Sequence, residues 1–111
     1  DQVTALFEDP DATIALSALS ILEAHARFQV RGRDDDFGEM LETYRQLLSR
    51  IYPADEAVVL RALILRRAAA ARLPAMDSLI AATAAYHNAT LVHRDPHFAG
   101  LPENQPRQLT L

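Results

Sequence analysis

The amino-acid sequence predicts a single α/β domain built on a mostly parallel sheet. Short apolar or β-branched runs, such as residues 12–17 (ATIALS) and 90–93 (TLVH), alternate with segments whose apolar residues recur at helical spacing. This alternation is typical of parallel strands joined by right-handed helical crossovers. The chain has 111 residues, half of them hydrophobic, which is enough for one core. We therefore expect residues 1–111 to form one domain.

The first elements are two helices with a strand between them. Residues 1–7 (DQVTALF) place apolar side chains at helical spacing and stop at the acidic, proline-bearing EDPD, which predicts an amphipathic helix. Residues 12–17 then fit a strand buried on both faces, because they form a short apolar run after a turn. Residues 18–28 (ALSILEAHARF) fit the helix that follows.

The middle of the chain predicts a loop, two helices and a short strand. The charged, glycine-bearing stretch RGRDDDFGEM indicates a loop that leads into a helix over residues 38–50. Residues 51–52 fit a short strand. Asp55 has the side chain and position of an N-cap for the next helix, over residues 57–72, which ends before Pro74.

The C-terminal third predicts a central helix and two strands. Residues 76–88 (MDSLIAATAAYHN) are nearly all apolar, with an acid in the first turn, and Asn88 suits a left-handed position at the end of the helix. Residues 90–93 then fit a strand. The tail QLTL, residues 108–111, fits a last strand at the sheet edge.

Composition excludes several classes of protein. The chain has no cysteine, which excludes disulfides, thiolate metal ligands and thiol catalysis. Eleven arginines and no lysine face fifteen acids, for a net charge of −4, so any contact with nucleic acid has to be local or helped by metal ions. No apolar run approaches the roughly 20 residues of a membrane span. We expect a cytoplasmic protein with no membrane partner.

Three acids stand inside or against apolar runs rather than on a charged face: Glu23, Asp77 and Asp95. Their expected places, near the start of two helices and the end of a strand, lie at the carboxyl edge of a parallel sheet. Carboxylates gathered there repel one another unless a cation offsets the charge. Mg²⁺ or Mn²⁺ would do so and would keep positions free for a phosphodiester and water.

Each acid also has an ordinary structural interpretation. Asp77 is a good N-cap residue, and Asp95 before a proline is a common turn residue. Glu23 fits a helix-surface acid four residues before Arg27. The residues alone leave both interpretations open.

The segments SALSILEAHARF and MDSLIAATAAYHNATLVHRDPHF resemble the PIN domain, specifically the VapC-type toxins of bacterial toxin–antitoxin pairs. The most specific part is D-x-L-I-A-A-T-A followed, after a small loop, by T-L-V-x-R-D-x-H-F. The resemblance implies a three-layer α/β/α sandwich and a metal-dependent endoribonuclease. It carries the catalytic, metal-binding acids over to Glu23, Asp77 and Asp95. It also implies Mg²⁺ or Mn²⁺ as cofactor, an RNA substrate, a cognate antitoxin and a homodimer.

The sequence departs from this family at its start. PIN domains open with a strand that carries an Asp, the fourth acid of the site, and DQVTALF matches the family's second helix instead. We therefore expect the first strand and first helix to be missing, either because the chain is a fragment or because the domain is degenerate. Activity of residues 1–111 alone would then be doubtful. The alternative to the nuclease is a catalytically incomplete interaction module that binds an antitoxin or another protein.

Several other residues have a functional and a structural interpretation. Five arginines near the expected site could contact phosphate, although solvated helix-face arginines are common: Arg61, Arg66, Arg67, Arg72 and Arg94. His93 and His97 flank Asp95 and could assist proton transfer or serve as ordinary surface histidines. No H-E-x-x-H zinc motif, glycine-rich phosphate loop or nucleophile elbow occurs, so a nucleotide hydrolase and a serine hydrolase have no support.

Overall fold

The computed structural model describes all 111 residues, which divide into two compact units, residues 1–52 and 53–111. Each unit is described by itself. The first contains α1 (Gln2–Glu8), β1 (Ala15–Ser17), α2 (Ala18–Val30), the 3-10 turn η1 (Asp34–Asp36), α3 (Phe37–Leu47) and β2 (Arg50–Tyr52). The second contains α4 (Glu56–Ala68), α5 (Ala75–Tyr86), β3 (Leu91–His93), the 3-10 turn η2 (Pro96–Gly100) and β4 (Gln108–Thr110). None of these helices is both long and apolar enough to cross a membrane.

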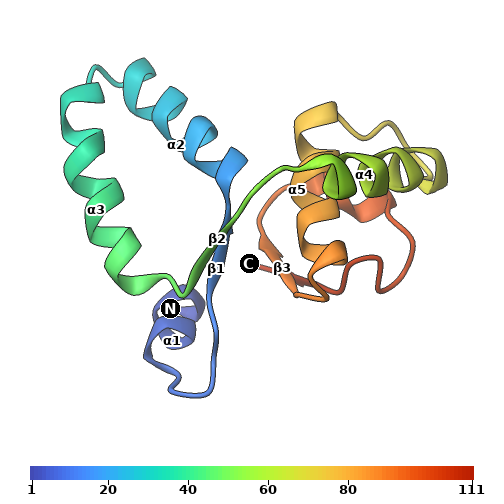
Figure 1. Ribbon diagram of the computed structural model, residues 1–111, viewed down its shortest axis with the longest axis horizontal. Helices are drawn as coiled ribbons and strands as arrows, with labels where there is room; N and C mark the ends of the chain where they lie inside the picture. Colours follow the sequence, from blue (N-terminus) through green and yellow to red (C-terminus); the bar gives the residue numbers. More distant parts are fainter. The chain divides into compact units, whose positions relative to one another are not determined.

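In the first unit, β1 and β2 form a parallel pair, with Ala15 opposite Arg50 and Ser17 opposite Tyr52. Ser17 ends the strand and also begins α2, because its hydroxyl accepts a hydrogen bond from the backbone N–H of Leu19 at 3.2 Å. Helix α2 runs up to the turn at η1, and α3 runs back from that turn (Figure 1). The strand–helix order of the sequence prediction is confirmed here.

The helix predicted over residues 38–50 is shorter at its C-terminal end. It stops at Leu47, because the backbone N–H of Ser49 donates to the carbonyl of Ile14 at 2.7 Å and Arg50 joins the ladder with β1. Hydrogen bonds to a segment distant in sequence therefore override the local helical pattern.

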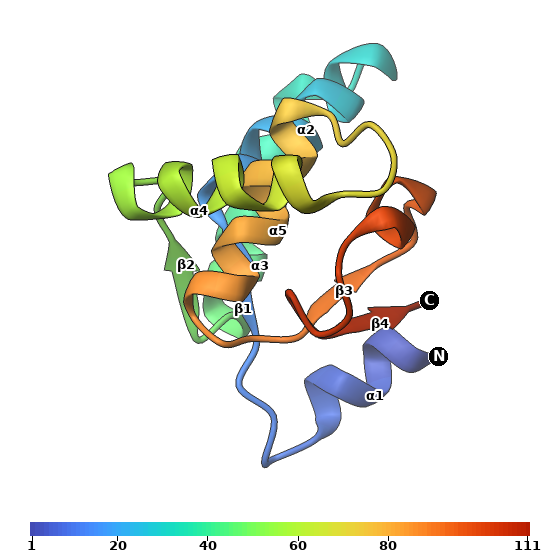
Figure 2. The ribbon, with the colours of Figure 1, turned by 90° about the vertical axis from the view of Figure 1, so that its right-hand side faces the viewer.

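In the second unit, α4 crosses α5, and β3 pairs with β4 in parallel (Figure 2). The register places Leu91 opposite Gln108 and His93 opposite Thr110. Together the chain has two two-stranded parallel sheets, β1 with β2 and β3 with β4. The predicted α/β class with parallel strands is confirmed.

The apolar core lies in the second unit. Alanines and a threonine on α5 let α4 approach closely, and a β3 leucine and the η2 phenylalanine close the core beside them. The buried hydrophobic residues are Val58, Ala62, Leu65, Leu73, Ala81, Ala82, Ala84, Leu91, Phe98 and Leu101. The prediction that residues 76–88 form a central helix is confirmed, and Asn88 after it has the expected positive φ of 52°.

The helix predicted over residues 57–72 ends at Ala68 instead of Arg72. Beyond it Ala69 is extended and the chain bends at Ala70 and Ala71, with the backbone N–H of Ala70 donating to the carbonyl of Gly100 at 2.8 Å. This path brings Leu73 into the core, where it is 3% exposed. Burial of Leu73 and the bond to Gly100 outweigh the helix propensity of the alanine run.

Asp55 caps α4 as predicted, with its carboxylate accepting from the backbone N–H of Val58 at 3.1 Å. Asp55→Ala is expected to lower the free energy of unfolding by about 1 kcal/mol, because a helix N-terminal N–H loses its partner. Asp55→Asn should be nearly neutral, since Asn caps as well as Asp. Urea denaturation followed by circular dichroism measures both variants. Equal stability of Asp55→Ala and the wild type would contradict the capping role.

Candidate metal centre

Asp77 stands in the first turn of α5, two residues after the helix begins at Ala75. The N-cap of α5 is Pro74 and no side-chain cap bond is present, so the N-cap interpretation of Asp77 is wrong. The position still favours a carboxylate, because the positive end of the helix dipole stabilises an anion there. The side chain of Asp77 is only 15% exposed. Its carboxylate is therefore held at the helix start without serving as the cap.

Asp95 lies between β3 and η2 and is fixed at its backbone and its side chain. Its backbone N–H donates to Nδ1 of His93 at 3.1 Å, and its Oδ1 accepts from the backbone N–H of His97 at 2.8 Å. Pro96 begins η2 with a restricted φ, which suits the first position of a turn. Asp95 therefore has the predicted turn role, and the same turn also fixes the direction of its carboxylate.

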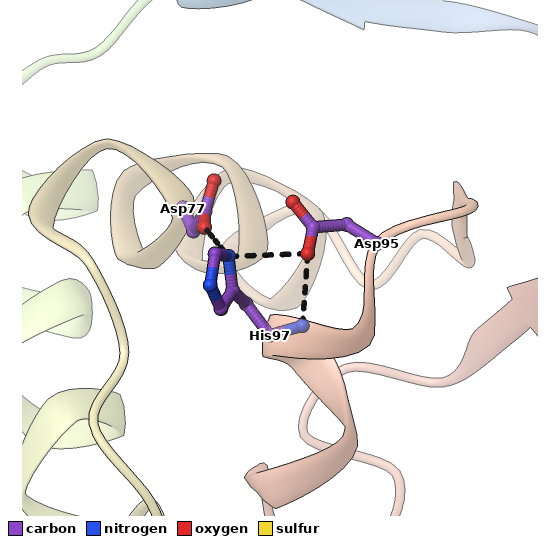
Figure 3. Close-up of side chains that lie close together, drawn as sticks. All are labelled: Asp77, Asp95 and His97. Carbon is purple, nitrogen blue, oxygen red and sulfur yellow. Dashed lines mark hydrogen bonds and ion pairs between the residues drawn. The ribbon is translucent and has the colours of Figure 1, made fainter.

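The His97 ring lies between the two carboxylates (Figure 3). Its Nδ1 is 2.9 Å from Oδ2 of Asp77 and 3.1 Å from Oδ1 of Asp95. With a proton on Nδ1, the ring can donate to both carboxylate oxygens and so holds the two acids near one another. The turn at Pro96 places this ring back over Asp95, two residues earlier in the chain.

Asp77, Asp95 and His97 each offer one ligand atom, and these atoms lie within 4.8 Å of one another. Two ligand atoms that bind one ion at about 2.1 Å and at right angles to each other lie about 3 Å apart. The two distances from His97 Nδ1 to the carboxylate oxygens are close to this value. Carboxylate oxygens suit Mg²⁺ and Mn²⁺, and a neutral imidazole suits transition metals. The side chains therefore fit a divalent ion.

An open cavity of about 220 Å³ borders Asp95 on the side of the β3–β4 pair. Its lining combines one carboxylate with one guanidinium, so it can receive a group that bears both an anionic part and a bound cation. The lining residues are His93, Arg94, Asp95, Pro96, Ala99, Gln108 and Thr110. Arg94 is exposed and lies directly beside the acid.

The predicted site residues divide between the two units. Asp77 and Asp95 come together in the second unit, as the sheet-edge argument predicted. Glu23 is half-buried on α2 in the first unit, so its place in a shared site stays a prediction. His97 was predicted to assist proton transfer or to lie on the surface, and its contact with both acids was missed. The D-P-H spacing is the sequence pattern that could have indicated it.

All five arginines are exposed, and one of them, Arg66, also has a hydrogen bond to the backbone. Nε of Arg66 donates to the carbonyl of Leu73 at 3.2 Å, which ties the segment after α4 to the helix. Arg66 therefore has a structural contact, and its phosphate contact stays a prediction. Arg61, Arg67 and Arg94 are exposed, as is Arg72.

Comparison with known proteins gives one positive result. A family model of the PIN domain matches residues 1–104, a range that includes elements of both compact units and all three predicted site acids. No curated protein and no solved structure matches the chain significantly.

Proposed function

Because the chain belongs to the PIN domain family, we propose that it acts as a metal-dependent endoribonuclease, the toxin of a VapC-type toxin–antitoxin pair. The observation that carries this proposal is the approach of Asp77 and Asp95, which two separate segments of the chain bring together with His97. Two carboxylates this close favour a cation between them. Such a toxin would work in the cytoplasm, where it meets its RNA and its antitoxin.

In the proposed site Asp77 and Asp95 hold Mg²⁺ or Mn²⁺, and Glu23 of α2 joins them as the third acid. A bound divalent ion acts as a Lewis acid and makes a water molecule a better nucleophile. The protein's own residues orient the reactants. The turn at Pro96 keeps the Asp95 carboxylate in place, and Arg94 beside the cavity holds an RNA phosphate by charge.

The proposal is tested by incubating the product of the whole coding sequence with structured RNA in Mg²⁺, in Mn²⁺ and in EDTA. Ion-dependent cleavage within the RNA supports an endoribonuclease. RNA that stays intact with every metal would refute it and favour the interaction module.

Arg94→Ala is expected to weaken RNA binding and to reduce the slope of log affinity against log salt by about 1. Without this guanidinium, binding of the protein releases about one counterion fewer from the RNA. Fluorescence anisotropy with a labelled RNA at several salt concentrations measures this. Arg31→Ala on the first unit is the matched control, since Arg31 follows α2 outside the candidate site. Unchanged salt dependence in Arg94→Ala would remove Arg94 from the RNA contact.

One observation favours the interaction module as the second candidate. Four apolar residues of α4 are between 41% and 58% exposed: Val59, Leu60, Leu63 and Ile64. An apolar row of this kind on a helix is a common protein-contact surface. Helices α1 and α3 of the first unit also expose Val3, Tyr44 and Leu47. A cognate antitoxin and a second copy of the chain are proposed partners in both candidates, so ion-dependent cleavage separates them.

A further inference from the structure

His93 connects the last strand of the chain to the backbone of Asp95. Its Nε2 lies 2.7 Å from Oε1 of Gln108 on β4, and its Nδ1 lies 3.1 Å from the backbone nitrogen of Asp95. The register of β3 and β4 brings these two side chains together. Gln108 is opposite Leu91, and Leu91 is two residues before His93 on the same face of the sheet. A single imidazole therefore bridges β4 and the proposed ligand Asp95.

The direction of these hydrogen bonds is fixed at the Gln108 end. The side-chain amide nitrogen of Gln108 donates to the backbone carbonyl of Phe98 at 3.0 Å. A carbonyl oxygen can only accept, so the NH₂ group has to face Phe98 and Oε1 has to face His93. Since Oε1 can only accept as well, Nε2 of His93 carries the proton and donates it.

The direction is fixed independently at the Asp95 end. The backbone N–H of Asp95 can only donate, so Nδ1 of His93 offers its lone pair and carries no proton. Both ends therefore require the same neutral form of His93, protonated at Nε2 alone. The ring is also held by Phe98, whose ring centroid is 4.7 Å away and whose side chain is buried in the core.

We propose that His93 and Gln108 are positioning residues that orient Asp95 for the divalent ion. Gln108 and the Asp95 N–H require the same tautomer of His93, and the ring held between them fixes the backbone of Asp95, so that the carboxylate points toward Asp77. The inference rests on the proposed function, since it assigns a role at that same metal site. Residues behind a ligand commonly affect metal affinity because they restrict its orientation.

Two substitutions at one position separate the two hydrogen bonds of His93. His93→Asn puts an amide oxygen near the place of Nδ1 and keeps an acceptor for the Asp95 N–H, but it no longer reaches Gln108. His93→Gln reaches Gln108 and has no acceptor beside Asp95. Mn²⁺ binding to the full chain is measured by the electron paramagnetic resonance of the free ion. We expect the Mn²⁺ Kd to rise roughly 10–100-fold in His93→Gln and to stay close to the wild-type value in His93→Asn.

A spectroscopic measurement without metal accompanies the affinities. In the wild type, ¹⁵N nuclear magnetic resonance should show His93 protonated at Nε2 and not at Nδ1. Gln108→Ala removes the acceptor of the His93 Nε2 proton at an exposed position, so the Nε2 and Asp95 amide signals should shift, although the Asp95 N–H still favours the Nε2–H form. Gln46→Ala on α3, also at an exposed glutamine, should change neither the His93 nor the Asp95 signal.

The outcomes distinguish this inference from the proposed function. Wild-type Mn²⁺ affinity in a folded His93→Gln variant, or an Nδ1-protonated His93 in the wild type, would overturn the inference alone. If His93→Gln does not fold, unchanged His93 and Asp95 signals in Gln108→Ala would overturn it. A wild-type chain that binds no Mn²⁺ would overturn the proposed metal site and this inference with it.

Discussion

Asp95→Asn is expected to lower ion-dependent RNA cleavage by on the order of 100-fold or more. Even residues that only support a metal ligand commonly change metal affinity or activity by roughly 10–100-fold. The substitution removes the negative charge that the ion needs. It should leave the fold intact, since an Asn oxygen can still accept the hydrogen bond from the His97 N–H that Asp95 accepts at 2.8 Å. Single-turnover cleavage of a labelled RNA at saturating Mn²⁺ measures the effect.

The matched control is Asp35→Asn, which removes the same charge from an exposed 3-10 turn in the first unit. Its cleavage rate should equal that of the wild type. Urea denaturation should give similar midpoints for Asp95→Asn and the wild type. If Asp95→Asn cut RNA at the wild-type rate, Asp95 would not belong to the catalytic site.

Phe98→Ala is expected to lower the free energy of unfolding by about 3–5 kcal/mol, the usual cost of removing a large buried aromatic side chain. Phe98 is 4% exposed and packs in the core of the second unit, beside the His93 ring. The loss combines apolar area returned to water with a cavity that the neighbouring helix residues fill only in part.

Urea denaturation of Phe98→Ala and Phe98→Leu gives the two free energies. Phe98→Leu should lose less, because it keeps most of the apolar volume. Tyr86→Ala on α5 is the control at a half-exposed aromatic, 47% exposed, and should have a smaller effect than Phe98→Ala. A loss below about 1 kcal/mol in Phe98→Ala, within the range of ordinary substitutions, would show that Phe98 does not hold this core together.

The helices and strands were largely predictable because local patterns determine them. Apolar spacing predicted α2 and the central helix α5, and the Asp55 cap and the left-handed Asn88 are properties of single residue types. The short runs at 90–93 and 108–111 correctly predicted β3 and β4, which pair in parallel.

The ends of two helices could not be read from the sequence because distant segments decide them. The carbonyl of Ile14 accepts a hydrogen bond from the N–H of Ser49, and the carbonyl of Gly100 accepts one from the N–H of Ala70. In both places the local sequence favours a longer helix. The bond that ends the helix comes from a segment about thirty residues or more away, so only the folded chain determines the boundary.

The approach of Asp77 to Asp95 was predictable from the sequence, and the contacts of His93 and His97 were not. Asp77 and Asp95 follow from the rule that helix starts and strand ends share one edge of a parallel α/β sheet. The role of His97 depends on the turn at Pro96, which returns the ring to the carboxylate of Asp95. The hydrogen bonds of His93 depend on the β3–β4 register, because Gln108 lies fifteen residues away in sequence.

We propose that Glu23 binds the same divalent ion as Asp77 and Asp95, and paramagnetic broadening by Mn²⁺ shows whether it does. Backbone amide signals of the full chain are recorded at substoichiometric Mn²⁺, with Mg²⁺ as the diamagnetic reference. We expect the signals of all three acids to broaden first and together, and Asp77→Asn to reduce the broadening at all three. Broadening at Asp77 and Asp95 that leaves Glu23 and its neighbours on α2 sharp would contradict the shared site.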